Sequence, residues 1–405
     1  MDDMPIDEHK GILKVHPDIV KLGVVSFLTD VSSEAIFSVF AVFFTAFAGA
    51  SAALLGVVEG FADFSASSLD YISGWLSDRS GKRKSLAVVG YGFSALAKFF
   101  LVIANSISSL ALFRIVERLG KSFRGPPRDA WLSEVAAEAD RGYSFGVHKA
   151  MDKAGAVAGP LLAFALFAWL GQNLYSFKIL FIGAAVVATL AVVVLIIMKE
   201  RLGVPHERDN IFRSWKVLSP AFKLYLLPAG IFSLAYFSFG FLLLKAYLVG
   251  FSIGDVILLY ALFNIAFVIT SIPVGKLGDR IGRTWVIMLS YLIYAAMAVG
   301  FIFASAKWEV IAFFIVFGMF YAIDEAQSKA FIADMEVERR GSAIGLYNFV
   351  TGLMYLPASI IAGWLWTIHP AYAFAVAAAI ALAALIVFAA FRNKFAVIRP
   401  RKSAI

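Results

Sequence analysis

Ionisable side chains interrupt several long apolar stretches of this sequence. The first of these stretches contains two carboxylates. Asp30 and Glu34 lie four residues apart in the stretch 18–46, so a helix places both on one face. A charge at the centre of a bilayer costs about 2.5–3.5 kcal/mol on insertion scales, which makes ionisable residues in such stretches functional candidates. Reversible binding of a proton is the chemistry that a carboxylate in such a place can perform.

Basic residues in the stretch 108–132 could oppose these acids. Arg114, Arg118 and Lys121 share one face of a helix, and Glu117 lies beside that face. At 1.5 Å per residue, Asp30 lies roughly 18 Å along its helix and Arg118 roughly 15 Å along its own, so the two reach similar depths. Arginine stays charged, whereas Asp and Glu can change protonation.

Two interpretations of these charges stay open. In the first, Asp30 and Glu34 change protonation, with Glu117 and Asp152 (in the stretch 143–170) as further candidates, because burial favours the neutral acid and a nearby cation favours the charged one. In the second, the charges form a structural network of ion pairs between helices. Under the first, the basic residues of the stretch 108–132 are also candidate ligands for a substrate.

The second half of the chain carries fewer such residues. Asp324 and Glu325 in the stretch 308–333 could be a second titrating site, a substrate site, or part of a cytoplasmic gate. Polar and aromatic side chains could line the rest of a substrate path, the candidates being Gln327, Tyr321, Tyr236, Asn264 and Asn348.

The composition excludes most soluble classes. Of 405 residues, 61% are hydrophobic and 16% are charged, and there is no cysteine. Soluble domains have roughly 45–50% apolar and about 25% charged residues, so this chain is an all-α polytopic membrane protein. Without cysteine, a His pair at helical spacing, a P-loop or a dinucleotide-binding turn, we expect no metal, no cofactor, no ATP-driven step and no enzyme activity.

Apolar stretches of membrane-spanning length recur along the chain. We place twelve helices at 18–46, 52–77, 85–105, 108–132, 143–170, 175–198, 219–247, 254–277, 284–305, 308–333, 342–367 and 371–391. Basic residues gather in alternate turns and in both tails, which places both termini in the cytoplasm. The net charge of +8 is therefore a topology signal and does not indicate nucleic-acid binding.

A sequence repeat divides the chain. Residues 74–83 (GWLSDRSGKR) recur about 200 residues later as 275–283 (GKLGDRIGR), and 130–134 (AWLSE) are echoed at 330–334 (AFIAD). We predict a cytoplasmic tail (1–17), a six-helix bundle (18–198), a linker (199–218), a second six-helix bundle (219–391) and a second tail (392–405). A parallel duplication predicts a substrate site between the halves.

Both copies of this loop resemble the loop between helices 2 and 3, and between helices 8 and 9, of the major facilitator superfamily (MFS). The resemblance covers essentially the whole chain and implies the MFS fold. It further implies that the loops latch one conformation of a transporter. The candidate latch residues in the loops are Gly74, Asp78, Arg79, Gly81, Asp279 and Arg280. The latch candidates also include Arg128, as a gate residue, and Gly155, Gly159 and Pro160, for close helix packing.

Three further segments are similar to a largely uncharacterised prokaryotic branch of that superfamily. They are residues 29–34 (TDVSSE), 120–130 (GKSFRGPPRDA) and 145–160 (FGVHKAMDKAGAVAGP). The last contains a partial Gly-x-x-x-Gly-Pro element, which in the superfamily is associated with antiporters.

The resemblance implies a secondary transporter that works by alternating access. We expect proton-coupled antiport that exports small amphiphilic or organic-ion solutes. The alternatives are a proton-coupled importer of an anionic nutrient or a siderophore-like metal chelate, and a membrane sensor that does not transport. The expected partners are a small solute, protons and membrane lipids, for a monomer in the inner (plasma) membrane of a prokaryote.

Overall fold

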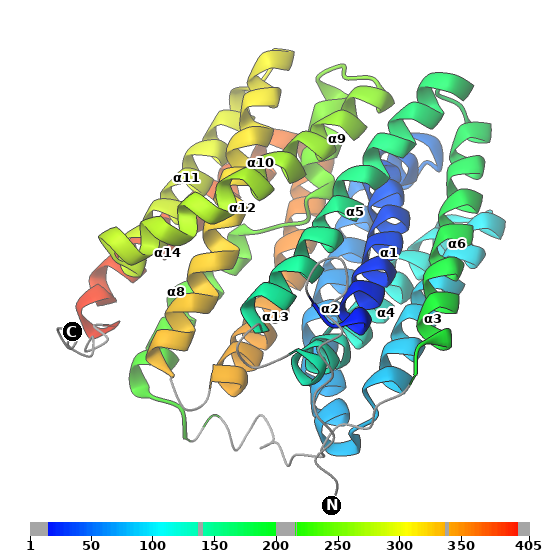
Figure 1. Cartoon of the computed structure of the whole chain (residues 1–405). Coiled ribbons are helices and arrows are strands. Elements are labelled where there is room, and N and C mark those ends of the chain that lie inside the picture. Colours follow the sequence, from blue (N-terminus) through cyan, green and yellow to red (C-terminus); the bar gives the residue numbers. More distant parts are fainter. Residues whose placement is uncertain (1–14, 137–140, 200–214, 216, 337–339, 396–405) are drawn as a thin grey trace, which may run out of the picture. The chain divides into compact units, whose positions relative to one another are not determined.

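The computed structural model describes residues 15–136, 141–199, 215, 217–336 and 340–395, and the regular structure in them is helical throughout (Figure 1). Most of both predicted tails and of the predicted linker lie outside these ranges. The helices are α1 Pro17–Val42, continued by a π-helical turn (η1, Phe43–Phe47), α2 Ala52–Ser80, α3 Arg83–Ile103, α4 Ile107–Val135, α5 Arg141–Leu170, α6 Leu174–Ile197, α8 Pro220–Ala235, α9 Gly240–Leu248, α10 Ile253–Ile281, α11 Arg283–Phe303, α12 Lys307–Met335, α13 Arg340–Ile368, α14 Pro370–Phe391 and the 3-10 turn η3 Arg392–Phe395.

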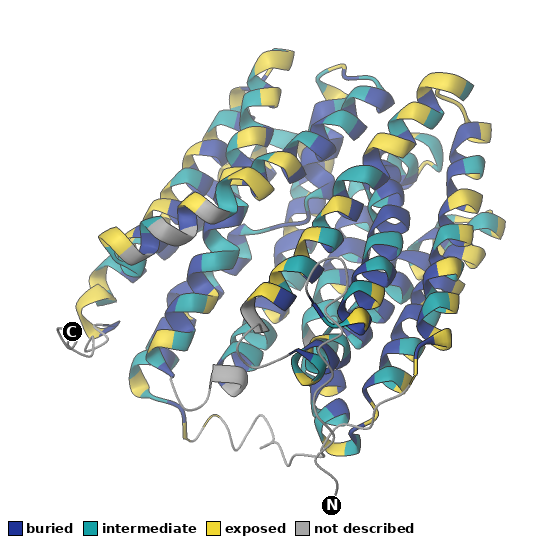
Figure 2. Ribbon diagram, in the orientation of Figure 1, coloured by how far each residue is buried: buried dark blue, intermediate teal, exposed yellow. Residues whose placement is uncertain are grey.

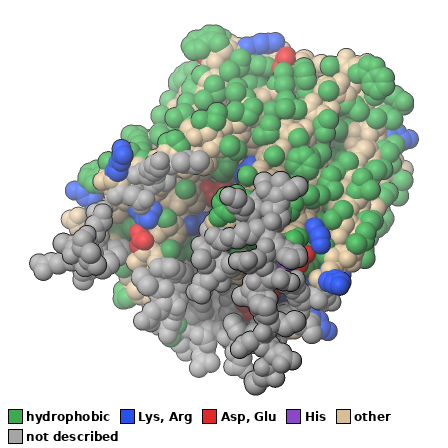
Figure 3. All heavy atoms as spheres, in the orientation of Figure 1, with side chains coloured by type: hydrophobic (Ala, Val, Ile, Leu, Met, Phe, Trp, Pro, Cys, Tyr) green, Lys and Arg blue, Asp and Glu red, His purple; other side chains and the backbone are tan. Residues whose placement is uncertain are grey.

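The helices have the length and surface of membrane spans. In the described residues, 10 spans are long and apolar enough to cross a bilayer, with α8 and α9 together forming one of them. The other two long helices, α4 and α12, carry charged clusters that lower their hydropathy. Large apolar side chains such as Trp169, Ile197 and Phe303 are exposed, and apolar atoms cover much of the visible face (Figures 2 and 3). The prediction of an all-α protein with twelve transmembrane helices is confirmed.

The chain packs as two compact units, and two helices, α2 and α10, each lie partly in one unit and partly in the other. Unit 1 contains the described parts of Met1–Ala50, Leu69–Arg208 and Phe251–Ala261, and unit 2 contains those of Ser51–Ser68, Asp209–Gly250 and Leu262–Ile405. The start of α2 therefore packs in unit 2 and the start of α10 in unit 1. The bundles predicted from the repeat (18–198 and 219–391) are continuous in sequence, so they do not include this division of α2 and α10 between the units.

In unit 1, glycines let helices approach at backbone distance. A Cβ on Gly155 would lie 2.4 Å from the carbonyl oxygen of Phe27, and a Cβ on Gly159 would lie 2.5 Å from that of Val31. The Gly-x-x-x-Gly element of α5 thus packs directly on α1, as small residues do between membrane helices. A Cβ on Gly90 of α3 would similarly lie 2.6 Å from the backbone nitrogen of Arg124 in α4.

In unit 2, the span predicted as one helix at 219–247 is broken between α8 and α9. The Ser238 N–H donates to Ser359 Oγ (3.1 Å), and Ser238 Oγ donates to a carboxylate oxygen of the buried Glu59 (3.0 Å). Side chains from α13 and from the start of α2 thereby satisfy polar groups at the break. Irregular backbone inside a membrane is tolerated only where protein supplies such partners.

Gly159→Ala should destabilise the protein by about 1–3 kcal/mol, because the new methyl group meets the backbone of α1, which cannot move away cheaply. Thermal unfolding of the purified protein in detergent measures the change. Gly183→Ala on α6 is the matched control, since a Cβ there meets nothing within 4 Å. Equal unfolding temperatures for the two variants would contradict the close α1–α5 contact.

Candidate functional site

Polar side chains of α1 and α4 meet at successive turns and form a ladder, called here the α1–α4 ladder. The two helices run in opposite directions past each other, so residue numbers rise on α1 as they fall on α4. The three rungs are Ser26 with Arg128 (hydrogen bond, 3.2 Å), Asp30 with Arg124 (ion pair, 3.9 Å) and Glu34 with Lys121 (ion pair, 3.3 Å). Glu34 thus meets Lys121 of the basic face predicted on α4, whereas Asp30 pairs with Arg124, which was not among the predicted site residues.

Asp152 of α5 joins the Ser26 end of the ladder. Ser26 Oγ donates to Asp152 Oδ1 (2.6 Å), and Arg128 and Lys149 lie 3.8 Å and 3.2 Å from its carboxylate. His148, one turn earlier on α5, is also buried. Asp152 is thus held by two cations and a hydroxyl, which ties α5 to both α1 and α4.

Glu117 lies in a second buried cluster that includes a residue absent from the sequence-based candidates. Ser33 Oγ donates to Glu117 Oε1 (3.0 Å), and the ammonium of Lys98 donates to Ser33 Oγ (3.0 Å) and Ser94 Oγ (3.3 Å). Arg114 lies 3.4 Å from Glu117. Lys98 is fully buried. Its position in the apolar stretch 85–105 was the signal that could have identified it, by the same argument that selected Asp30.

Glu34 has a second partner from far along the chain. The phenol of Tyr260, at the start of α10, donates to the Glu34 carboxylate within unit 1. The Tyr260 ring meets Phe37 edge to face at 5.4 Å, and the guanidinium groups of Arg114 and Arg118 lie 4.5 Å and 5.7 Å from the Phe37 ring centre. Tyr260 is not among the site residues predicted from the sequence, because no local pattern relates residues 226 positions apart.

Basic side chains outnumber acidic ones in the interior of this region of unit 1. Among the described residues of this region, the buried and half-buried bases are Lys98, Arg114, Arg118, Lys121, Arg124 and Arg128 of α3 and α4 and Lys153 of α5, and the buried and half-buried acids are Asp30, Glu34, Asp70, Glu117 and Asp152. Asp129, which also pairs with Arg128, is exposed. A buried region with a surplus of one sign of charge attracts ligands of the opposite sign.

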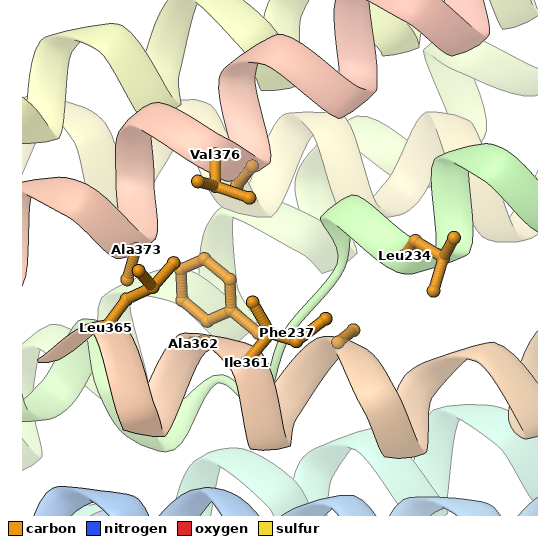
Figure 4. Close-up of a pocket in the computed structure, with 9 residues that line it drawn as sticks. Leu234, Phe237, Ile361, Ala362, Leu365, Ala373 and Val376 are labelled. Carbon is orange, nitrogen blue, oxygen red and sulfur yellow. The ribbon is translucent and has the colours of Figure 1, made fainter.

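Unit 2 carries an aromatic cluster in place of a ladder. Tyr236 lies 5.5 Å from Tyr355 and 6.4 Å from Tyr321, between ring centres, and Phe263 lies 5.8 Å from Tyr321. Phe237 instead packs against Phe374 (5.6 Å). There it lines a small apolar cavity between α8, α13 and α14, of about 10 Å³ (Figure 4). That is no more than one water molecule needs, so this cavity is not a substrate site.

The polar candidates of unit 2 are dispersed among separate contacts. Gln327 donates to the carbonyl oxygen of Val274 (2.9 Å) and accepts from Arg283 (3.4 Å), so it joins α12 to α10 and α11. Asp324 accepts from Ser328 (3.4 Å), and Glu325 pairs with Lys329 (3.3 Å) on the same helix. Asn264 is buried and Asn348 is half-buried.

The repeated loop forms a clamp in each unit. Arg83 bonds to Asp78 (3.0 Å) and to Glu134 at the end of α4 (3.0 Å). Its counterpart Arg283 pairs with Asp334, the residue that corresponds to Glu134 in the repeat. In each unit, therefore, the acid of the clamp comes from the shorter repeated segment (130–134 or 330–334), and the arginine comes from the repeated loop (74–83 or 275–283).

The other latch candidates in the two loops do not form part of these clamps in the described residues. Arg79 stacks on Trp75 (5.2 Å to the ring centre), and Arg280 is exposed. Gly81 and Gly282 have φ of 66° and 94°, a left-handed backbone that favours glycine at the turn after each long helix. The side chain of Asp279 lies outside the described residues.

Comparisons with known proteins agree with this architecture. The family model of the Major Facilitator Superfamily matches residues 22–249 and 229–404. An uncharacterised MFS-type transporter of Methanocaldococcus jannaschii is 35% identical over 364 residues, which is 88% of this chain and 90% of that protein. Multidrug resistance protein MdtH of Photorhabdus laumondii is 30% identical over 142 residues, covering 35% of this chain and 34% of that protein. The crystal structure of nucleoside transporter NupG shares the fold, with a TM-score of 0.74 at 13% identity, over 93% of this chain and 100% of that one.

Lys98→Met should destabilise unit 1 by about 3 kcal/mol, because Glu117 and two buried serine hydroxyls lose a cation. The double variant Lys98→Met/Glu117→Gln should recover part of the lost stability, since it also removes the buried negative charge of Glu117. Thermal unfolding in detergent measures both. Lys178→Met, which removes an exposed lysine on α6, is the control. Our assignment fails if Lys98→Met unfolds at the temperature of Lys178→Met.

Proposed function

The chain belongs to the major facilitator superfamily, and we propose that it is a secondary active transporter that couples the movement of a small solute to protons by alternating access. The single observation that carries the proton coupling is the α1–α4 ladder, in which Asp30 and Glu34 pair with cations of α4. Energy from ATP is not needed in this scheme, because the proton gradient drives the conformational cycle.

Protonation gives the ladder two states. With Asp30 and Glu34 charged, their ion pairs hold α1 to Arg124 and Lys121. A proton on either acid removes one attraction, and the cation it leaves is free to bind another anion. Because unpaired charge is costly in a buried site, protonation and rearrangement are coupled. In this proposal Glu117 and Asp152 are secondary coupling candidates, since each is held by several donors.

Export by antiport is the first candidate direction. The Gly155 and Gly159 contacts with α1 fit the antiporter-associated element, and the partial similarity to a multidrug resistance protein agrees with it. The solutes would then be small amphiphilic molecules or organic ions. The aromatic cluster of unit 2, with Tyr236 and Tyr321, would provide an apolar wall for them.

Uptake of an anionic solute or metal chelate is the second candidate. The observation that favours it is the surplus of basic side chains around the α1–α4 ladder. Arg114, Arg118 and Lys121 are the proposed ligands for the solute in this case.

The remaining assignments follow from the family and the charge pattern. We place the protein in the inner (plasma) membrane of a prokaryote with both termini in the cytoplasm, because its basic turns lie on one side. The Arg83–Asp78 and Arg283–Asp334 clamps, on that side, would hold the ends of helices during the conformational change. We expect a monomer surrounded by lipid.

Asp30→Asn and Glu34→Gln should each abolish solute-driven proton flux in proteoliposomes, since an amide cannot carry the proton. The assay screens organic anions and lipophilic cations and follows internal pH with a trapped dye. Asp255→Asn is the control, because this acid caps the start of α10 and an amide oxygen can replace its hydrogen bond. Full proton flux in both ladder variants would contradict the coupling assignment.

A further inference from the structure

We propose that Lys121 is a shared counter-ion, and that the transported solute is an amphiphilic organic anion whose carboxylate or phosphate group replaces Glu34 at Lys121. The proposal rests on the proposed function of proton-coupled transport and names its substrate class. Three features of unit 1 support it: the accessibility of Lys121, the aromatic pair beside it, and the surplus of positive charge.

Lys121 is the accessible cation of the ladder. Its side chain is 36% exposed, whereas that of Arg124 is 3% exposed. Arg124 is also fixed, because its guanidinium packs 4.7 Å from the ring centre of Tyr91 while it pairs with Asp30. A solute entering this region can therefore contact Lys121, whereas the buried Arg124 stays paired with Asp30.

The aromatic pair Phe37 and Tyr260 supplies an apolar surface next to this cation. Phe37 follows Glu34 by three residues on α1, which is one helical turn, and Tyr260 contacts both of them. A solute whose acidic group binds Lys121 can thus lay a ring or hydrocarbon group against Phe37. The phenol of Tyr260, which donates to Glu34, can donate to the incoming anion in the same way.

The charge surplus selects the sign of the solute. Seven buried or half-buried bases of α3, α4 and α5 lie here among five buried or half-buried acids of α1, α2, α4 and α5 in the described residues, so a cationic solute would add to an excess that an anion reduces. Arg118 lies on the Lys121 face of α4, near Phe37, and adds to the attraction for an anion.

Replacement of Glu34 has a consequence for the proton. Lys121 and Arg118 of α4, Lys153 of α5, Tyr260 of α10 and Asp30 on its own helix all act on Glu34. Once the anion takes Lys121, the displaced Glu34 carboxylate loses its ion pair at 3.3 Å, and in this proposal it then binds a proton. The site then gains one anion and one proton, and its net charge is unchanged. Anion and proton therefore bind together, which favours the uptake candidate over antiport.

Three matched probes of one ring system test the proposal: 2-naphthoate, its neutral amide, and the cationic 2-naphthylmethylammonium. Calorimetric titration of the full chain in nanodiscs, repeated in buffers with different ionisation enthalpies, measures affinity and proton uptake together. We expect 2-naphthoate to bind about tenfold or more tightly than the other two, with uptake of about one proton. Failure of 2-naphthoate to bind, or equal affinity for the ammonium probe, would overturn the proposal.

Variants separate a shared counter-ion from a structural ion pair. Glu34→Gln should bind 2-naphthoate at least as tightly as the original protein but take up no proton, because Lys121 no longer has a competing carboxylate. Lys121→Gln should weaken binding about tenfold or more, and Lys121→Arg should restore it. Lys178→Gln, which removes an exposed lysine on α6, is the control and should change neither quantity. If Glu34→Gln weakened binding as much as Lys121→Gln, the competition would be refuted.

Proton flux in proteoliposomes distinguishes this proposal from the one it rests on. Proton flux driven by the ammonium probe alone would leave proton-coupled transport in place and overturn the anionic substrate. Binding of 2-naphthoate with proton uptake but without any transmembrane flux would support the site and contradict the transport function.

Discussion

Charges buried between α1 and α4 dominate the organisation of unit 1. Removing a carboxylate or an ammonium from water is costly unless an opposite charge or several hydrogen bonds compensate it. Each interior acid in this region meets that condition, for example Glu34 between Lys121 and Tyr260, and Asp152 between Ser26 and Lys149. The helices that carry these groups must therefore keep their register, since a shift of one residue would leave several charges unpaired.

Close helix packing makes that register possible. Gly155 and Gly159 let α5 contact the backbone of α1, and Gly90 lets α3 contact α4 next to Arg124. Larger residues would separate the helices and lengthen the hydrogen bonds of Ser26 and Ser33. Small residues and buried charges thus depend on each other here.

The internal repeat preserves the scaffold, while the chemistry of the two halves has diverged. Both units keep an arginine clamped to the end of the following long helix, Arg83 to Glu134 and Arg283 to Asp334. Unit 1 has filled its interior with ion pairs, whereas unit 2 has an aromatic cluster around Tyr236. One unit is thereby suited to holding charge and the other to holding apolar groups.

The sequence by itself determined the membrane helices, the repeat, and the placement of Asp30 and Glu34 on one face, because hydropathy and the 3.6-residue period are local properties. It did not identify Lys98 or Tyr260, nor the break between α8 and α9 at Ser238. Those features depend on which helices touch and at what register. Tertiary structure alone decided that Lys121 pairs with Glu34 and Arg124 with Asp30, since several cations on α4 were equally available to each acid until the glycine contacts fixed the helices.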